Sequence, residues 1–172
     1  MKILLIVLGA IVVLIATVVA IGAYLPKRHV VSRSAVFKAN PERLFGLVAG
    51  SQSWRPEVKT CEVIQENGKT FQRETSRHGQ TVTYAIEGVR PPYALRRRIA
   101  TKDLPYGGTW YVALEQEGDS TSETRVQITE DGEVYNPVFR FVSKYIMGET
   151  ATQDAYLKAM GKAVGEDVQV GD

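Results

Sequence analysis

The 172-residue chain has little of the chemistry by which many enzymes and metal proteins are recognised. It has one cysteine, Cys61, which excludes an intramolecular disulfide and any multi-cysteine metal site. The two histidines, His29 and His78, are far apart, and no HExxH or paired CxxC spacing occurs, so no metal and no cofactor are expected. GxSxG, Walker A and GxGxxG patterns are also missing, so no catalytic residue is assigned.

The chain also lacks an excess of charge of either sign. It has 21 basic and 19 acidic residues, with a formal net charge of +2. A near-neutral domain has no basic surface for a phosphate backbone, so nucleic acid is not an expected partner. The charges are unevenly placed, because residues 3–25 contain none and all basic residues except Lys2 follow Pro26.

Residues 3–25 form an apolar run of membrane-spanning length. A bilayer core about 30 Å thick needs roughly 20 helical residues, and Pro26 ends the run. We therefore predict a transmembrane anchor over 1–26 and one domain over 27–172, with the bilayer as a partner. A cleaved signal peptide, with Ala20-Ile21-Gly22 as its cleavage site, and a buried core helix remain as alternatives.

The charges beside the apolar run indicate its orientation. Lys2 precedes the run, and Lys27, Arg28, Arg33 and Lys38 follow it. Because cytoplasmic flanks carry more basic residues, the chain is predicted to be a single-pass membrane protein with its C-terminal domain in the cytoplasm. The sequence gives no prediction of the oligomeric state.

Strand-like runs separated by turn residues dominate the rest of the chain. A first strand over 29–38 leads into Asn40-Pro41-Glu42, which is typical of a helix start. That short helix is expected to end at Gly50, and residues 51–56 are expected to form a second short helix. Six further strands are predicted at 58–66, 69–77, 80–89, 93–102, 108–117 and 122–131. The short gaps between them, rich in Gly and Pro, indicate an antiparallel meander, with a turn at 117–120 before the last strand.

A final helix is predicted from about 137 to 166, with a bend at Gly148. Its apolar stripe comprises Val142, Ile146, Leu157, Met160 and Val164. A curved antiparallel sheet cannot bury its apolar face alone, so this long helix is expected to cover it and leave a hollow between them. The fold class is therefore α+β, with about seven antiparallel strands, two short helices after the first strand, a long C-terminal helix and a preceding transmembrane helix.

This order of elements resembles the helix-grip fold of the START-like, or SRPBCC, superfamily. That group includes the polyketide cyclase/dehydrase and lipid-transport proteins and the Bet v 1-like proteins. The resemblance covers most of 28–166 and includes Trp54-Arg55-Pro56, the residues 39–45 before it, and Gly107-Gly108-Thr109-Trp110. It implies a deep apolar pocket between the sheet and the terminal helix that holds a lipid or another hydrophobic molecule.

Candidate ligand-binding residues follow from alternation along the strands and from the stripe of the last helix. Tyr106 is included because it lies in a loop expected near the pocket mouth, and the polar helix residues because they interrupt an inward-facing stripe. The candidates are Tyr84, Arg97, Tyr106, Trp110, Val112, Ile146, Glu149 and Gln153. For the aliphatic members, an ordinary place in the core is the alternative.

Arg97 is the most informative of these residues. Alternation turns it inward between Leu95 and Ile99, where an unpaired charge would be costly. Its partner is expected to be either an acidic group of a ligand or one of the glutamates at 74, 87 and 149.

The sequence thus favours a membrane-anchored domain that binds a hydrophobic or amphipathic, lipid-like small molecule. A polyketide cyclase/dehydrase-type enzyme and a non-catalytic interaction domain with a filled core are the two alternatives. The volume and polarity of the hollow distinguish among them.

Overall fold

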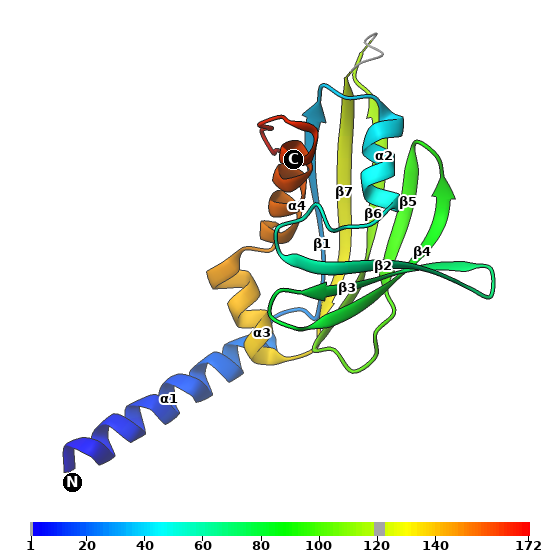
Figure 1. Cartoon of the computed structure of the whole chain (residues 1–172). Helices are drawn as coiled ribbons and strands as arrows, with labels where there is room; N and C mark the ends of the chain where they lie inside the picture. The colour runs from blue at the N-terminus through cyan, green and yellow to red at the C-terminus, as the bar shows by residue number, and fades with distance from the viewer. Residues whose placement is uncertain (1, 119–122) are drawn as a thin grey trace.

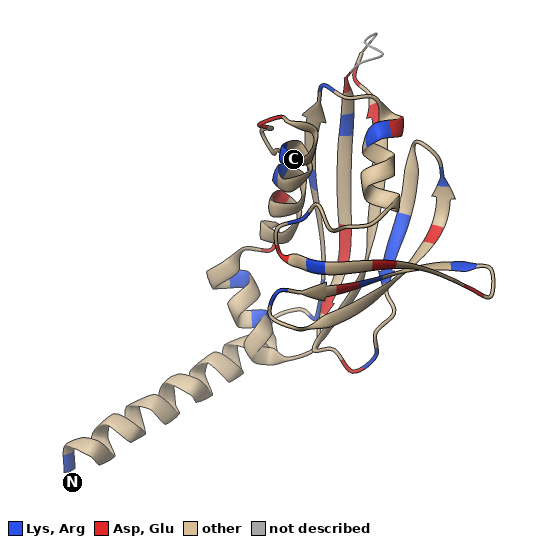
Figure 2. Cartoon of the chain, in the orientation of Figure 1, with Lys and Arg blue, Asp and Glu red and all other residues tan. Residues whose placement is uncertain are grey.

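The computed structural model describes residues 2–118 and 123–172 and consists of one protruding helix and one α+β domain (Figure 1). Helix α1 (Lys2–Tyr24) carries no charge beyond Lys2 (Figure 2). Within the described ranges it is the one helix that is long and apolar enough to cross a membrane. Its apolar side chains are exposed except that of Val18, which is partly buried, and only Gly22 is buried.

Seven strands form a single antiparallel sheet with the order β1-β7-β6-β5-β4-β3-β2. The strands are β1 (Arg28–Phe37), β2 (Val58–Glu66), β3 (Lys69–Ser76), β4 (Thr81–Arg90), β5 (Ala94–Ile99), β6 (Tyr106–Gln116) and β7 (Thr124–Val134). The predicted meander is confirmed for β2 to β7, and β1 joins it by pairing with β7. Residues 119 and 120 of the predicted turn at 117–120, and residue 122 at the start of the predicted strand 122–131, lie outside the described residues.

Helix α2 (Pro41–Ala49) begins as predicted, because the Asn40 side chain accepts a hydrogen bond from the Arg43 amide at 3.0 Å. The second short helix predicted at 51–56 was wrong, since those residues form turns. In its place, Gln52 turns back and its Nε2 donates to the carbonyl oxygens of Leu47 and Val48 at 2.7 and 3.0 Å. These carbonyls belong to the last turn of α2, which a helix end leaves without partners.

The C-terminal region contains three helical elements where one bent helix was predicted. They are α3 (Pro137–Val142), the π-helical turn η1 (Ser143–Met147) and α4 (Ala151–Val164). The break falls at Gly148, as predicted, where φ is +86°. Its amide donates to the carbonyl of Ser143 at 3.0 Å, five residues back, which defines the wider π turn.

The apolar core lies where α2 and α4 cover the sheet. Alternation along the strands is confirmed, since Leu95, Val112, Leu114, Val126 and Ile128 are all buried there. In Figure 1, α3 lies at the opposite end of the domain, beside α1. The core therefore fills one end of the sheet and leaves the concave face at the α3 end for a cavity.

Candidate functional site

A cavity of about 370 Å³ lies between the concave face of the sheet and the α3–η1 segment. Sheet residues form one side and helical residues the other. The apolar and aromatic part of the lining comprises Tyr84, Ile99, Trp110, Val134, Phe139, Val142 and Met147. The volume is near the lower end of the ~300–1,000 Å³ typical of small-molecule sites. The expected hollow between sheet and C-terminal helical region is therefore present.

A second hollow of about 660 Å³ lies beside the loop between β5 and β6. It is shallower, and its lining includes Arg28, Arg98, Lys102, Asp103, Asp131 and Glu133. Small-molecule sites are usually enclosed and largely apolar, with a few placed polar groups. The smaller, more enclosed cavity fits that description better, so we take it as the candidate site.

One end of the cavity is closed by a buried ion cluster. Arg97, which is 4% exposed, pairs with Oε1 of Glu74. The other oxygen of Glu74, Oε2, accepts from Nη1 of Arg55 at 3.0 Å. The guanidinium of Arg97 lies over the Tyr84 ring, 4.3 Å from its centroid. Of the three glutamates expected as partners of Arg97, at 74, 87 and 149, Glu74 is therefore the one that pairs with it.

The neighbouring arginines of β5 confirm the expected alternation. Arg96 and Arg98 lie on the outer face, about half exposed, and both donate to Glu87 at 2.7 and 2.8 Å. Glu87 is therefore unavailable to Arg97, because it faces the other side of the sheet.

Aromatic contacts support Arg55. Its guanidinium lies 5.2 Å from the ring centroid of the buried Tyr156 on α4. Trp54 and Trp110 contact the same ring edge to face at 5.1 and 5.3 Å. The Tyr156 hydroxyl donates to Oε1 of Gln52 at 2.9 Å. These contacts fix the loop after α2 against α4, and with it the position of Arg55.

Burial raises the pKa of Tyr84 to about 12. The phenol therefore remains protonated at physiological pH and keeps its hydroxyl hydrogen as a donor. Because Tyr84 lines the cavity beside Arg97, this end of the site offers hydrogen-bond donors.

A titratable pair lies on another part of the wall. Nε2 of His29 on β1 is 3.5 Å from Oε1 of Glu130 on β7, and both residues line the cavity. The other oxygen of Glu130 accepts from Nε1 of Trp110 at 2.9 Å. Hydrogen bonding to Glu130 raises the pKa of His29 above its ordinary value. The imidazole of His29 therefore holds its proton more readily than a free histidine does.

Five of the eight candidate residues line the cavity, namely Tyr84, Arg97, Tyr106, Trp110 and Glu149. Val112 lies in the apolar core instead, 2% exposed. Gln153 is fully buried in α4 and is not among the lining residues. Its Nε2 is 3.5 Å from the Val31 carbonyl oxygen, and its Oε1 has no hydrogen-bond partner within the described part of the chain.

The placement of Ile146 in the cavity was wrong, since its side chain is 70% exposed and is not part of the lining. The prediction assumed an α-helical repeat from Val142 onwards. The π turn of η1 inserts extra residues into that repeat, so Val142, Ser143 and Met147 face the cavity and Ile146 turns outward.

Sequence reasoning missed Arg55 and the pair His29–Glu130. Arg55 was visible in the Trp54-Arg55-Pro56 motif, but nothing in the motif shows that this loop residue meets Glu74 on β3. His29 directly follows the anchor, so no local signal indicated that β1 would place it beside β7.

Comparisons with known proteins agree with this architecture. The family model described as polyketide cyclase / dehydrase and lipid transport matches residues 28–164. No curated protein matches the chain.

Solved structures of the same fold come from distant relatives. A START superfamily protein from Mycobacterium smegmatis is 19% identical, with a TM-score of 0.62, covering 79% of this chain and 97% of its own. A conserved protein from Geobacillus kaustophilus is 14% identical, with a TM-score of 0.62 and coverage of 83% and 100%. Norcoclaurine synthase from Thalictrum flavum is 14% identical, with a TM-score of 0.59 and coverage of 80% and 86%. At these identities the likeness concerns the fold alone.

Proposed function

Because the chain belongs to the polyketide cyclase/dehydrase and lipid transport family, we propose that it is a membrane-anchored domain that binds a hydrophobic or amphipathic small molecule. The observation that carries this proposal is the cavity of about 370 Å³, whose lining combines apolar and aromatic side chains with charged and hydrogen-bonding groups. The alternative of an interaction domain with a filled core predicts no such cavity, because its own side chains would occupy that space.

The lining indicates the kind of ligand. Ile99, Val134, Phe139 and Met147 suit an apolar body, which gains free energy by leaving water. The charge of Arg97 is already balanced by Glu74, so the ligand need not be an acid. The Tyr84 phenol beside Arg97 lines the cavity and stays protonated, so its hydroxyl is available to a ligand. A carbonyl, hydroxyl or carboxyl oxygen at that end of the ligand would suit this donor.

Helix α1 supports the anchoring part of the proposal. Its 23 residues would extend ~35 Å at 1.5 Å each, enough for a hydrocarbon core about 30 Å thick. Basic residues that follow it favour a cytoplasmic domain. A domain tethered in this way meets membrane-dissolved ligands at high effective concentration.

Binding can be tested with the full-length protein and a dansyl-labelled fatty acid as probe. Val142→Trp would fill the cavity. The matched control is Phe141→Trp, because Phe141 does not line the cavity and packs on Tyr145, with ring centroids 5.1 Å apart. We expect dansyl fluorescence to rise with the wild type and with Phe141→Trp, and affinity to fall at least tenfold with Val142→Trp. A wild type that does not bind the probe, or a Val142→Trp variant that binds it equally well, would contradict the proposal.

A polyketide cyclase/dehydrase-type enzyme is the second candidate, favoured by the His29–Glu130 pair. The Glu130 carboxylate, which accepts a hydrogen bond from Trp110, and the His29 imidazole beside it could together move a proton to or from a bound molecule. Mass spectrometry of the molecule recovered from the wild type and from Glu130→Gln distinguishes the two candidates. The same molecule in both variants supports binding, whereas accumulation of a different precursor in Glu130→Gln supports catalysis.

A further inference from the structure

The joint between α1 and α3 is a packed contact. A Cβ atom on Gly22 would lie 1.9 Å from the carbonyl oxygen of Pro137, so the two helices touch through their backbones. Arg140 is buried, and its Nη1 donates to the carbonyl oxygens of Leu25 and Ala23 at 2.7 and 3.4 Å. Carbonyls at a helix end otherwise require water or a capping group. The domain is therefore held to α1 at a fixed position.

An apolar surface lies next to this joint. We call Phe139, Tyr145, Ile146 and Met147 the η1 patch, and these side chains are 51%, 58%, 70% and 64% exposed. Clustered exposed side chains of this kind commonly mark a site of interaction with a membrane or a protein. Phe139 and Met147 also line the cavity, so the same side chains face both the ligand site and the exterior.

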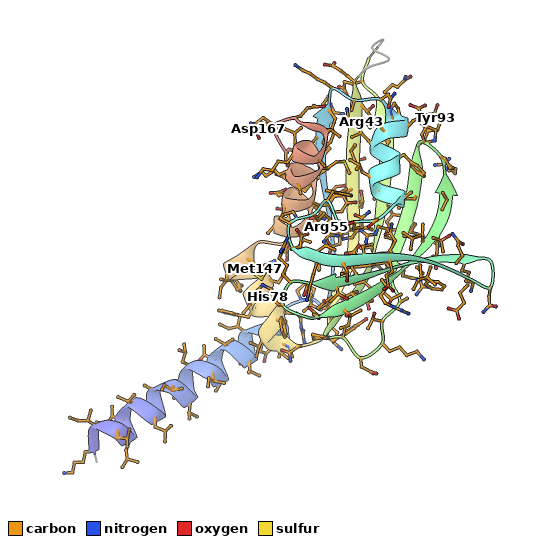
Figure 3. All side chains as sticks on the ribbon, viewed as in Figure 1. Arg43, Arg55, His78, Tyr93, Met147 and Asp167 are labelled. Carbon is orange, nitrogen blue, oxygen red and sulfur yellow. The ribbon has the colours of Figure 1, made fainter. Side chains whose placement is uncertain are left out.

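The patch lies at the level where α1 ends. Figure 1 shows α3 beside the last turns of α1, with η1 continuing from α3 toward α4 and the sheet farther along. In Figure 3, Met147 lies on that segment, and Arg55, at the closed end of the cavity, lies farther from α1. If α1 spans a bilayer and ends at Tyr24, the η1 patch falls near the boundary between headgroups and acyl chains. Lys144 within the segment, 43% exposed, is a residue type that suits that boundary.

We propose that the η1 patch is seated in the interfacial layer of the bilayer that holds α1. In that position Phe139 and Met147 border an opening through which a ligand passes directly between the acyl layer and the cavity. This inference rests on the proposed function and adds that the cavity opens to lipid. A lipid surface is the occupant favoured here, because the patch follows α3 directly and Arg140 ties α3 to the end of α1, whose apolar side chains are exposed.

The seating can be measured by depth-dependent quenching. Full-length protein carrying Cys61→Ser and Ile146→Cys is labelled with a fluorophore and placed in phosphatidylcholine vesicles whose acyl chains carry nitroxide groups. The matched control is Cys61→Ser with Val63→Cys, because Val63 is 46% exposed on β2. We expect quenching at 146 to exceed quenching at 63 by at least threefold. Equal quenching at the two positions, or shielding of 146 that depends on protein concentration and not on the lipid, would overturn the inference.

A second pair of variants tests passage through the opening. Gly22→Ala forces α1 and α3 apart, whereas Gly9→Ala adds the same methyl group where nothing lies within 4 Å. We expect Gly22→Ala to slow uptake of the dansyl-labelled fatty acid from vesicles at least fivefold at an unchanged equilibrium affinity, and Gly9→Ala to change neither. Equal uptake rates would overturn the proposed route.

The two proposals fail in different ways. If the wild type does not bind the probe while position 146 is quenched by lipid, the ligand-binding function fails and the membrane seating stands. If the wild type binds the probe and position 146 is not quenched, the seating fails alone.

Discussion

Glu74 is the residue whose charge should matter most to stability. Its side chain is 6% exposed and lies between Arg97 and Arg55, which are 3% and 11% exposed. Glu74→Gln keeps the shape of the side chain and removes the carboxylate that pairs with Arg97. Arg55 retains Glu57 at 2.6 Å, whereas Arg97 has no second acidic partner within the described residues. Losing one member of a buried pair costs about 3–5 kcal/mol, because the remaining charge is uncompensated.

The expected effect is large enough to measure by thermal unfolding. For a chain of this size about 1 kcal/mol changes the melting temperature by about 2–4 °C, so Glu74→Gln should lower it by roughly 6–20 °C. The matched control is Glu62→Gln, because Glu62 is 3.7 Å from Arg73 with both side chains more than half exposed. An exposed pair contributes about 0–1 kcal/mol, which corresponds to a change of at most about 4 °C. Circular dichroism of both full-length variants in the same detergent gives the comparison.

A double variant identifies the cause of the loss. Arg97→Met alone leaves Glu74 paired with Arg55, so it should cost less than Glu74→Gln. Combining the two changes removes the unpaired Arg97 charge and should recover part of the stability. The reasoning is refuted if Glu74→Gln behaves like Glu62→Gln, or if the double variant is no more stable than Glu74→Gln alone.

Three further predictions concern other parts of the site. The raised pKa of His29 implies stability that is fully present below about pH 6.5 and is lost as pH rises through the folded-state pKa. Glu130→Gln should therefore destabilise the protein more at about pH 6 than at about pH 9, and NMR titration should give a lower His29 pKa in the variant than in the wild type. Equal destabilisation at both pH values would contradict this. Gln153→Met should leave thermal stability unchanged or higher, because it removes a buried oxygen without a partner, and a tenfold loss of probe affinity would place the residue in the site after all. Ultraviolet titration of the wild type should show a tyrosine ionising near pH 12 that is missing from Tyr84→Phe.

Much of the fold follows from local patterns in the sequence. Asn40 and Asn136, each followed by proline, begin helices as predicted, because an asparagine cap and a proline at the first position act within one turn. Strand alternation also placed Arg97 inward, since a two-residue repeat needs no knowledge of the rest of the fold.

Other features of the site depend on contacts that the local pattern does not contain. The contact between Arg55 and Glu74 joins a loop to a strand, and His29 meets Glu130 only because β1 pairs with β7. Ile146 was misplaced because the amino-acid composition of this segment does not distinguish a π turn from an α turn, and the two place residue 146 on different faces.

The two edges of the sheet bear on how copies of this protein would meet. If α1 anchors the chain as proposed, neighbouring copies would meet in two dimensions, and an exposed strand edge is a template for pairing with another chain. The outer edge of β1 is met at Ser34 by the chain's own tail, through the backbone hydrogen bonds between Ser34 and Gly171 at 2.8 and 2.9 Å. The β2 edge carries Lys59, Glu62 and Glu66. Charged side chains on an edge and a segment that covers part of an edge both oppose edge-to-edge association, so neither edge of this sheet is open along its full length to a second copy.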